Sequence, residues 1–240
     1  SRYYLQADEE VDLNKFRVHR LGLSGESTLS QWLTEMEEER GSIRVGFDPS
    51  VVSMQAHGIY SSALHSEGSE MVPIDGNLVD AVWEEQPAPP SHSIYALHES
   101  VTGMGVAEKL LSVRKEMVNV DADRLVLTKL DEIAWVTNLR GDDIPFNPVF
   151  EAYMVIDMDQ ATCFTRSTMP AALLDELSSL VEFRTYESYV GFMQLAGSDK
   201  SGAVWLDSSG TTMATRILIT ADQKIHESAN PVVMMKAIKN

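Results

Sequence analysis

Apolar residues recur at helical spacing in several stretches of the chain, and the clearest of these stretches follows Thr28. Leucine, tryptophan, leucine and methionine fall there at positions i, i+3, i+4 and i+7, which is the spacing of one helix face. Thr28 and Gln31 have the spacing of a capping box, in which each side chain accepts a backbone N–H of the other residue. The pattern predicts an amphipathic helix that begins after Thr28 and ends at Gly41.

The same periodicity predicts further helices along the chain. Thr128 and Asp131 form a second candidate capping box, and Gly141 is expected to end the helix that they open. Pro170 suits a helix start, because proline has no N–H to donate and its φ is already helical. These predicted helices lie within 52–68, 77–83, 105–117 and 128–141, and after Pro170.

Short runs of β-branched and aromatic residues between these helices predict strands. Two runs, 153–156 and 162–164, are separated by an acidic turn and predict a β-hairpin. Strands and helices alternate in both halves of the chain, so the fold class predicted is α/β in two modules. The other predicted strands lie at 2–7, 16–18, 43–47, 71–74, 124–127, 181–183 and 203–206.

The strongest break in the pattern is a proline-rich stretch at 87–93. Clustered prolines favour extended backbone and cannot join a helix interior. We therefore expect a hinge at 87–93 that separates a first domain, residues 1–86, from a second domain, residues 94–240.

Composition narrows the class of protein. The chain has 240 residues, 44% of them hydrophobic, which is enough for a sizeable core. No run approaches the roughly 18 apolar residues of a membrane span, so a membrane protein is excluded. The single cysteine, Cys163, forms no intrachain disulfide and no thiolate zinc site, which leads us to expect a cytoplasmic location. A net charge of −17 would repel DNA and RNA, because nucleic acids are bound mainly by lysine and arginine.

Side chains for acid–base or metal chemistry are scattered. No two of the six histidines have the i, i+4 spacing of an HExxH zinc helix. The carboxylate pairs Asp142–Asp143 and Glu84–Glu85 are expected to be solvated. The sequence therefore indicates neither a catalytic residue nor a metal ligand in this chain.

One dense polar segment spans the end of the helix predicted at 128–141 and the loop after it. It brings asparagine, arginine, glycine and aspartate into a loop that contains two prolines. In one interpretation these residues are solvated beyond a helix C-terminus. In the other, the loop presents Arg140 and Asn147 to a neighbouring domain.

This segment, LDEIAWVTNLRGDDIPFNPVF at 130–150, resembles the LDEIAWLxNLRGxDIxxNPVF signature in the middle domain of Xaa-Pro aminopeptidases, the aminopeptidase P family. Phe146 stands at a variable loop position of that signature. Five other pieces resemble the family in the same order, and the order of all six carries the resemblance. They are RYYLQA at 2–7, VGFDP at 45–49, NLVDAVW at 77–83, the helix start EKL with VR at 108–114, and KAIKN at 236–240.

The resemblance implies two creatinase-type domains with a ribonuclease H-like α/β fold. Residues 1–86 would be the C-terminal portion of the first domain, truncated at its N-terminus, and 94–240 the middle domain. Members of the family remove an N-terminal residue that precedes proline, using two divalent metal ions, usually manganese. The ligands, two Asp, one His and two Glu, would lie in a catalytic domain beyond Asn240. This chain is therefore expected to hold no cofactor and to be inactive alone.

The resemblance also implies site residues and partners. Arg2 is expected to bind substrate, and Arg140, Asp142 and Asn147 to form an interdomain loop. The expected partners are the chain's own C-terminal catalytic domain and, for the parent enzyme, peptides with a penultimate proline. A strand at 2–7 with an unpaired edge could also recruit a second copy and form a homodimer.

The signature favours a non-catalytic N-terminal region of a cytosolic Xaa-Pro aminopeptidase that shapes substrate access and assembly. An alternative is a catalytically inert, peptidase-like interaction module of a chaperone-type protein. A creatinase or a prolidase would share the fold but fits the long signature less well.

Overall fold

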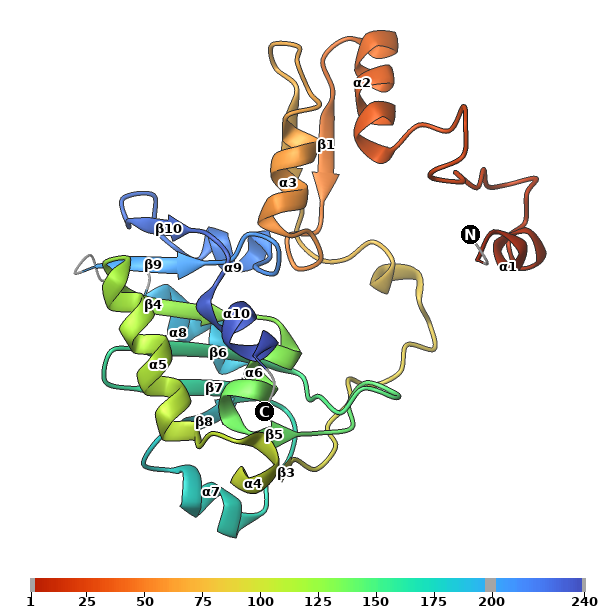
Figure 1. The fold of residues 1–240 in the computed structure, drawn as a ribbon. Helices are drawn as coiled ribbons and strands as arrows, with labels where there is room; N and C mark the ends of the chain where they lie inside the picture. Colours follow the sequence, from red (N-terminus) through yellow and green to blue (C-terminus); the bar gives the residue numbers. More distant parts are fainter. Residues whose placement is uncertain (1–2, 197–201, 239–240) are drawn as a thin grey trace. The chain divides into compact units, whose positions relative to one another are not determined.

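The computed structural model describes residues 3–196 and 202–238 (Figure 1). The chain divides into two compact units, which are described separately: Ser1–Phe47 with Ala56–Ile74, and Asp48–Gln55 with Asp75–Asn240. The proline-rich stretch at 87–93 belongs to the second unit in this division, and a domain boundary at that stretch stays a prediction.

The first unit contains two parallel strands, β1 (Arg44–Phe47) and β2 (Glu70–Pro73), both of which the sequence predicted. Helix α2 (Leu29–Arg40) has the predicted capping box and ends at Gly41. The Gln31 N–H donates to Thr28 Oγ1 at 3.3 Å, and the Thr28 N–H donates to Gln31 Oε1 at 2.8 Å. The unit also contains α1 (Tyr3–Glu10) and most of α3 (Met54–Ser61).

The strand predicted at 2–7 is wrong, because the chain forms helix α1 from Tyr3 onward. Gln6 Nε2 donates to Glu10 Oε1 one turn later, at 3.0 Å. A run of six residues fits the period of a helix as well as that of a strand. Among the described residues no strand pairs with it, so the helical hydrogen bonds within the run determine its structure. The strand predicted at 16–18 does not form either. The homodimer contact expected at the edge of the 2–7 strand therefore loses its basis.

The second unit is built on a six-stranded mixed sheet with the order β10-β9-β4-β6-β7-β8. Strand β6 (Ala152–Asp157) runs antiparallel to both of its neighbours, and it forms the predicted hairpin with β7 (Ala161–Thr165). The other neighbouring pairs are parallel. The predicted α/β class is confirmed. The remaining strands of the sheet are β4 (Ala122–Leu127), β8 (Glu182–Thr185), β9 (Ala203–Leu206) and β10 (Ile225–Glu227).

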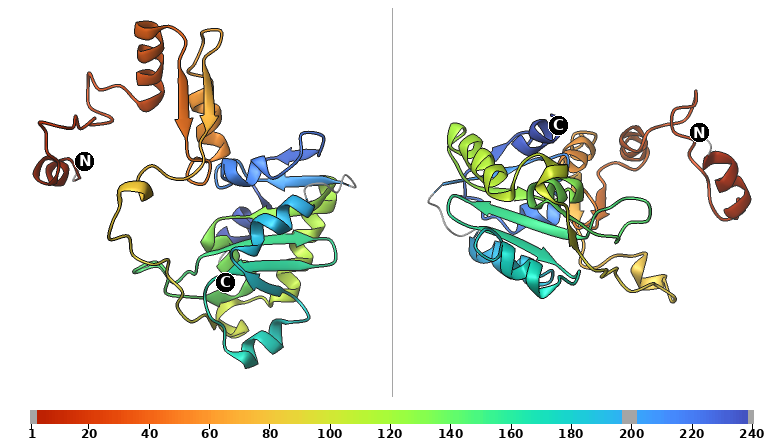
Figure 2. Two further views of the ribbon diagram at one scale, coloured as in Figure 1. Left: turned by 180° about the vertical axis from the view of Figure 1, so that it is seen from behind. Right: turned by 60° about the horizontal axis from the view of Figure 1, so that its bottom comes forward.

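Helices cover both faces of this sheet, with α5 (Val106–Asn119) and α8 (Ser188–Ala196) on opposite sides (Figure 2). Because successive strand residues point to opposite faces, Leu125 packs in the core cluster of α5, whereas Val126 packs in the cluster of α8. Smaller elements surround these layers. They are η1 (Asp80–Val82), β3 (Tyr95–Ala96), α4 (Glu99–Thr102), α6 (Leu130–Thr137), β5 (Leu139–Arg140), α7 (Ala171–Leu177), α9 (Met213–Ile217) and α10 (Pro231–Ala237).

Helix α6 differs from its prediction at both ends. Its N-cap is Lys129 and no side chain caps it, so the capping box predicted at Thr128 is wrong. Its C-terminal residue is followed by Asn138 in the left-handed conformation, at φ 56°. Asparagine adopts this conformation more readily than most residues, so the helix stops before Gly141 is reached.

Candidate functional site

A pocket of about 390 Å³ lies beside the C-terminal end of α6, within the second unit. Its walls come from α4, α5, α6, β5, the loop before β6 and the end of α10. Arg140 and Asn147, two of the predicted site residues, both line it. Asp142 does not line the pocket and is exposed, and Arg2 lies outside the described residues.

Arg140 contacts the C-terminal end of α6 through one nitrogen of its guanidinium. Nη1 donates to the carbonyl oxygens of Ala134 at 2.7 Å and Leu139 at 2.8 Å. Carbonyls at a helix C-terminus carry partial negative charge and attract cations. Burial nevertheless lowers the pKa of Arg140, and the nearby Tyr95 offsets part of that effect.

Lys109 lies in the same pocket and is only 1% exposed. Its Nζ donates to the carbonyl oxygen of Trp135 at 2.8 Å and to Oδ1 of Asn138, and it sits 4.2 Å from the centroid of the Trp135 ring. Burial, followed by the positive charge of Arg140, lowers the pKa of Lys109 to about 8. Two cations therefore share one pocket at the end of a helix.

The loop after Arg140 is held in one conformation by its own backbone. A Cβ on Gly141 would lie 2.7 Å from Cβ of Phe150, so only glycine fits there. The Asn147 N–H donates to the carbonyl oxygen of Ile144 at 3.0 Å. At the tip, Phe146 has a left-handed φ of 64° and its side chain is fully exposed. A bulky residue held in this conformation, with its ring in solvent, makes Phe146 a candidate contact residue.

Asp143 anchors this loop and is buried, which corrects the expectation that it would be solvated. Its carboxylate accepts the N–H of His92 at 3.0 Å, the N–H of Glu151 at 2.8 Å and the hydroxyl of Ser167 at 2.6 Å. Burial alone would raise the pKa of Asp143, but these hydrogen bonds favour the carboxylate and lower it. Asp143 is thus a structural residue, in contrast to its exposed neighbour Asp142.

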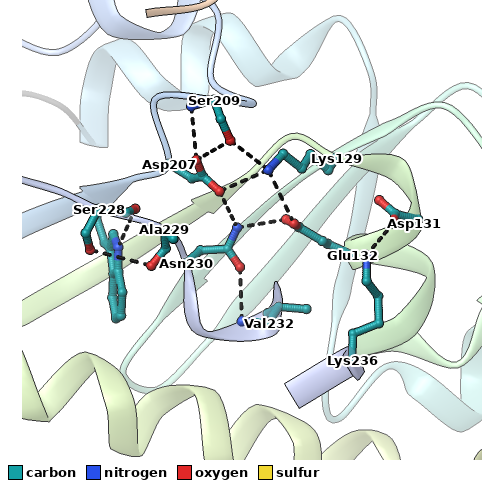
Figure 3. A network of polar contacts seen from close by, with 11 residues as sticks. Lys129, Asp131, Glu132, Asp207, Ser209, Ser228, Ala229, Asn230, Val232 and Lys236 are labelled. Carbon is teal, nitrogen blue, oxygen red and sulfur yellow. Dashed lines mark hydrogen bonds and ion pairs between the residues drawn. The ribbon is translucent and has the colours of Figure 1, made fainter. Parts of the chain in front are cut away.

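A second polar cluster joins α6 to β9 and α10 (Figure 3). Nδ2 of Asn230 donates to Glu132 Oε2 at 2.8 Å and to Asp207 Oδ2 at 3.2 Å, and Lys129 Nζ donates to Asp207 Oδ2 at 3.0 Å. Burial raises the pKa of Glu132. Burial would also raise the pKa of Asp207, but hydrogen bonds from Ser209 and Lys129 lower it. Each buried carboxylate has a partner, so this cluster cross-links the unit.

The described residues contain neither a metal-binding cluster nor a membrane-spanning helix. Residues 3–196 and 202–238 contain no group of three or more His, Cys, Asp or Glu side chains that could hold a metal ion. A di-metal centre therefore does not fit the side chains that the structure describes. Within the same ranges, no helix has both the length and the apolar character that crossing a membrane requires.

Sequence reasoning missed Lys109, Trp135 and the buried role of Asp143. A signal for Lys109 was available, since Val106, Lys109 and Leu110 fall at i, i+3 and i+4 of one helix face. A lysine on an apolar face requires a buried acceptor. No comparable pattern distinguishes Asp143 from Asp142.

Comparison with known proteins identifies a family model that matches residues 85–240. Its description is the Creatinase/Prolidase N-terminal domain. The match includes the whole pocket and the loop at 141–150.

Curated relatives and a solved structure match the chain over its full length. The "Probable Xaa-Pro aminopeptidase P" of Pyrenophora tritici-repentis is 31% identical, and "Xaa-Pro aminopeptidase ApepP" of Drosophila melanogaster is 34% identical. The chain spans 41% and 39% of these two proteins. The X-prolyl aminopeptidase of Caenorhabditis elegans, described as a cytosolic enzyme with a di-nuclear active site, superposes with a TM-score of 0.89 at 25% identity. The chain covers 40% of that structure.

Proposed function

The chain belongs to the creatinase/prolidase N-terminal domain family, and from this membership we propose that it is the non-catalytic N-terminal region of a cytosolic Xaa-Pro aminopeptidase. The parent enzyme would release an N-terminal residue that precedes proline. The observation that carries the proposal is the alignment of the entire chain with relatives named Xaa-Pro aminopeptidase. The fold shared with the Caenorhabditis elegans enzyme supports it.

The part of this chain in the parent would be to shape substrate access and assembly. Proline supplies no N–H and has a fixed φ, so an enzyme that accepts it at the second position cannot bind an amide N–H there. The loop at 141–150 supports a contact role, because Gly141 packs closely against Phe150 while Phe146 is exposed. In this proposal Arg140, Asp142, Asn147 and Phe146 face the catalytic domain of the same protein.

The catalytic metals would be held by that other domain. Two divalent ions, with manganese as the expected metal, would activate water and stabilise the oxyanion that forms when the peptide bond is attacked. The described residues of this chain do not fit such a centre. Arg2 is the one substrate-binding residue that we propose here, through contact with peptide oxygens.

A second candidate is an inert interaction module of a chaperone-type protein. The observation that favours it is the same loop with its exposed Phe146, which would suit any protein partner. The two candidates would differ in the rest of the longer protein, which would be a hydrolase only if it carried the two Asp, one His and two Glu ligands.

The experiment is an assay of the longer protein with manganese on an Arg-Pro-Pro peptide, on an Arg-Ala-Pro control peptide and on creatine. The proposal expects release of arginine from Arg-Pro-Pro alone. Hydrolysis of creatine would favour a creatinase. A longer protein without activity on any substrate would favour the interaction module.

A further inference from the structure

The pocket beside α6 contains two cations, Lys109 and Arg140, that no side chain of the described residues neutralises. Among the described residues, no carboxylate lies within ion-pair distance of Lys109 or Arg140. The one carboxylate that lines the pocket, Asp131, is paired with Lys236, which also lines it. Burying an uncompensated charge is costly, and burying two like charges together is more so.

Helix capping accounts for only part of the donors on these two side chains. The guanidinium of Arg140 has five N–H groups, but its described hydrogen bonds all leave from Nη1. Nε and Nη2 have no acceptor among the described residues. The ammonium of Lys109 has three N–H groups, and the described acceptors are Trp135 and Asn138. Nε and Nη2 of Arg140 therefore remain for a ligand in the pocket, and Lys109, which also lies over the Trp135 ring, contributes its charge.

The rest of the wall is largely apolar. The Trp135 ring, Leu97 and Val149 contribute to it, together with Pro148 and Ile238. A ligand that fits these surroundings has an anionic end for the two cations and an apolar body for the wall. The planar edge of a guanidinium with two free nitrogens matches the two oxygens of a carboxylate.

We propose that this pocket binds the carboxylate of a peptide residue that has an apolar body, with Arg140 and Lys109 as its anchors. The carboxylate supplies the negative charge that the pocket lacks, and the apolar body covers Trp135. An acidic side chain and a C-terminal carboxylate share this chemistry. The inference concerns the pocket alone and does not depend on whether the longer protein is a peptidase.

A bound carboxylate should change the titration of Lys109. In the free chain, burial and Arg140 hold the pKa of Lys109 at about 8. The charged groups around it are Arg140, Asp131 and Lys236, of which the last two neutralise each other. An anion placed beside Lys109 favours the ammonium, so the pKa of Lys109 must rise when the ligand binds.

The experiment is a pH titration of the lysine Cε–Hε resonances of the isotopically labelled 240-residue chain by NMR. N-acetyl-leucine represents a C-terminal carboxylate, and N-acetyl-glutamic acid α-amide represents an acidic side chain. N-acetyl-leucinamide has the same apolar body as the first probe without the charge. Inorganic phosphate is the fourth arm.

The proposal expects the Lys109 resonance to titrate at a higher pH with one or both carboxylates, and at an unchanged pH with the amide. Whichever carboxylate shifts it identifies the source. An unchanged Lys109 with both carboxylates would overturn the proposal. An equal shift with phosphate, or with the uncharged amide, would overturn the ligand class.

Variants test the two anchors separately. Arg140→Lys keeps the charge but loses the planar pair of donors, and is expected to weaken about tenfold the binding of the carboxylate probe that shifts Lys109. The matched control is Lys115→Gln, which removes a charge from an exposed position of α5 and should bind as the unaltered chain does. Equal binding by Arg140→Lys and Lys115→Gln would contradict the role of Arg140. The Lys109 titration of the unaltered chain decides the proposal even where a variant fails to fold.

Discussion

The buried carboxylate of Asp143 accepts both the backbone N–H and the Nδ1 of His92, at 3.0 and 3.1 Å, from a residue 51 positions earlier in the chain. This contact ties the end of the proline-rich stretch to the loop that carries Phe146. Since Asp143 also accepts from Glu151 and Ser167, one side chain fixes three segments relative to one another.

Substituting Asp143→Asn should destabilise the chain by about 1–3 kcal/mol. The amide replaces one accepting oxygen of the carboxylate by an NH₂ group, so a buried donor loses its acceptor. The control is Asp142→Asn at the exposed neighbouring position, which should change the free energy of unfolding by less than about 0.5 kcal/mol. Urea denaturation of the three proteins measures both values. Equal stability of Asp143→Asn and Asp142→Asn would contradict the anchoring role of Asp143.

The same variant predicts a pH dependence with a definite sign. The pKa of Asp143 is lower in the folded chain than its ordinary value of 3.8, so its carboxylate stabilises the fold above that pH and stops doing so as the pH falls through the folded pKa. The stability difference between the unaltered chain and Asp143→Asn should therefore be full near neutral pH and shrink below about pH 3.8. A difference that grows on acidification would refute this assignment.

Glu132 should show the opposite sign. Burial raises its pKa above the ordinary 4.5, so the ionised form is the costly one, and stability is lost as the pH rises through the folded pKa. Glu132→Gln cannot ionise and can still accept from Asn230, so it should gain stability relative to the unaltered chain as the pH rises above about 4.5. Denaturation at a series of pH values measures the trend, and a relative loss with rising pH would contradict it.

Gly141 should be sensitive to the smallest substitution. A Cβ at this position meets Cβ of Phe150 at 2.7 Å and the carbonyl oxygen of Val149 at 3.2 Å, so Gly141→Ala should cost about 1–3 kcal/mol. The matched control is Gly191→Ala in the exposed interior of α8, where nothing lies within 4 Å of the added carbon. That control should stabilise the chain by about 0.5–1 kcal/mol. Thermal unfolding of both variants measures the difference between them. A Gly141→Ala variant as stable as the unaltered chain would contradict the close packing at Gly141.

Substitution of Phe146 should have opposite effects on the stability of the isolated chain and on that of the longer protein. Because its left-handed backbone is strained and its ring is exposed, Phe146→Gly should stabilise the isolated chain by about 1 kcal/mol. In the longer protein the same change should lower the melting temperature, since it would remove the proposed contact of Phe146 with the catalytic domain. The control is Leu111→Ala, at a 70% exposed position of α5, which should leave the melting temperature of the longer protein unchanged. A longer protein that Phe146→Gly stabilises would contradict the proposed contact.

The sequence predicted those parts of the fold where the residue pattern is compatible with only one kind of secondary structure. The hairpin of β6 and β7 and the capped helix α2 are examples, since alternation over several residues and a capping box are both specific. The run at 2–7 was too short for its period to be read, and it is a helix from Tyr3. Helix α6 ended earlier than predicted because Asn138, and not Gly141, is the residue that ends it, in the left-handed conformation.

The candidate site was predicted only in part, for a similar reason. Arg140 and Asn147 come from one continuous segment, and the structure brings both to the pocket. Lys109 reaches the same pocket from α5, 31 positions earlier than Arg140 in the sequence, and only the packing of α5 against α6 brings the two together. Asp143 shows that burial of one of two adjacent carboxylates depends on partners as distant as His92.

The most direct test of the account is to measure manganese content and peptide turnover of the purified 240-residue chain after dialysis against manganese. We expect no stoichiometric metal and no release of arginine from Arg-Pro-Pro, because the proposed function assigns the metal ligands to a separate catalytic domain. Two manganese ions bound per chain, together with turnover that a chelator abolishes, would contradict it.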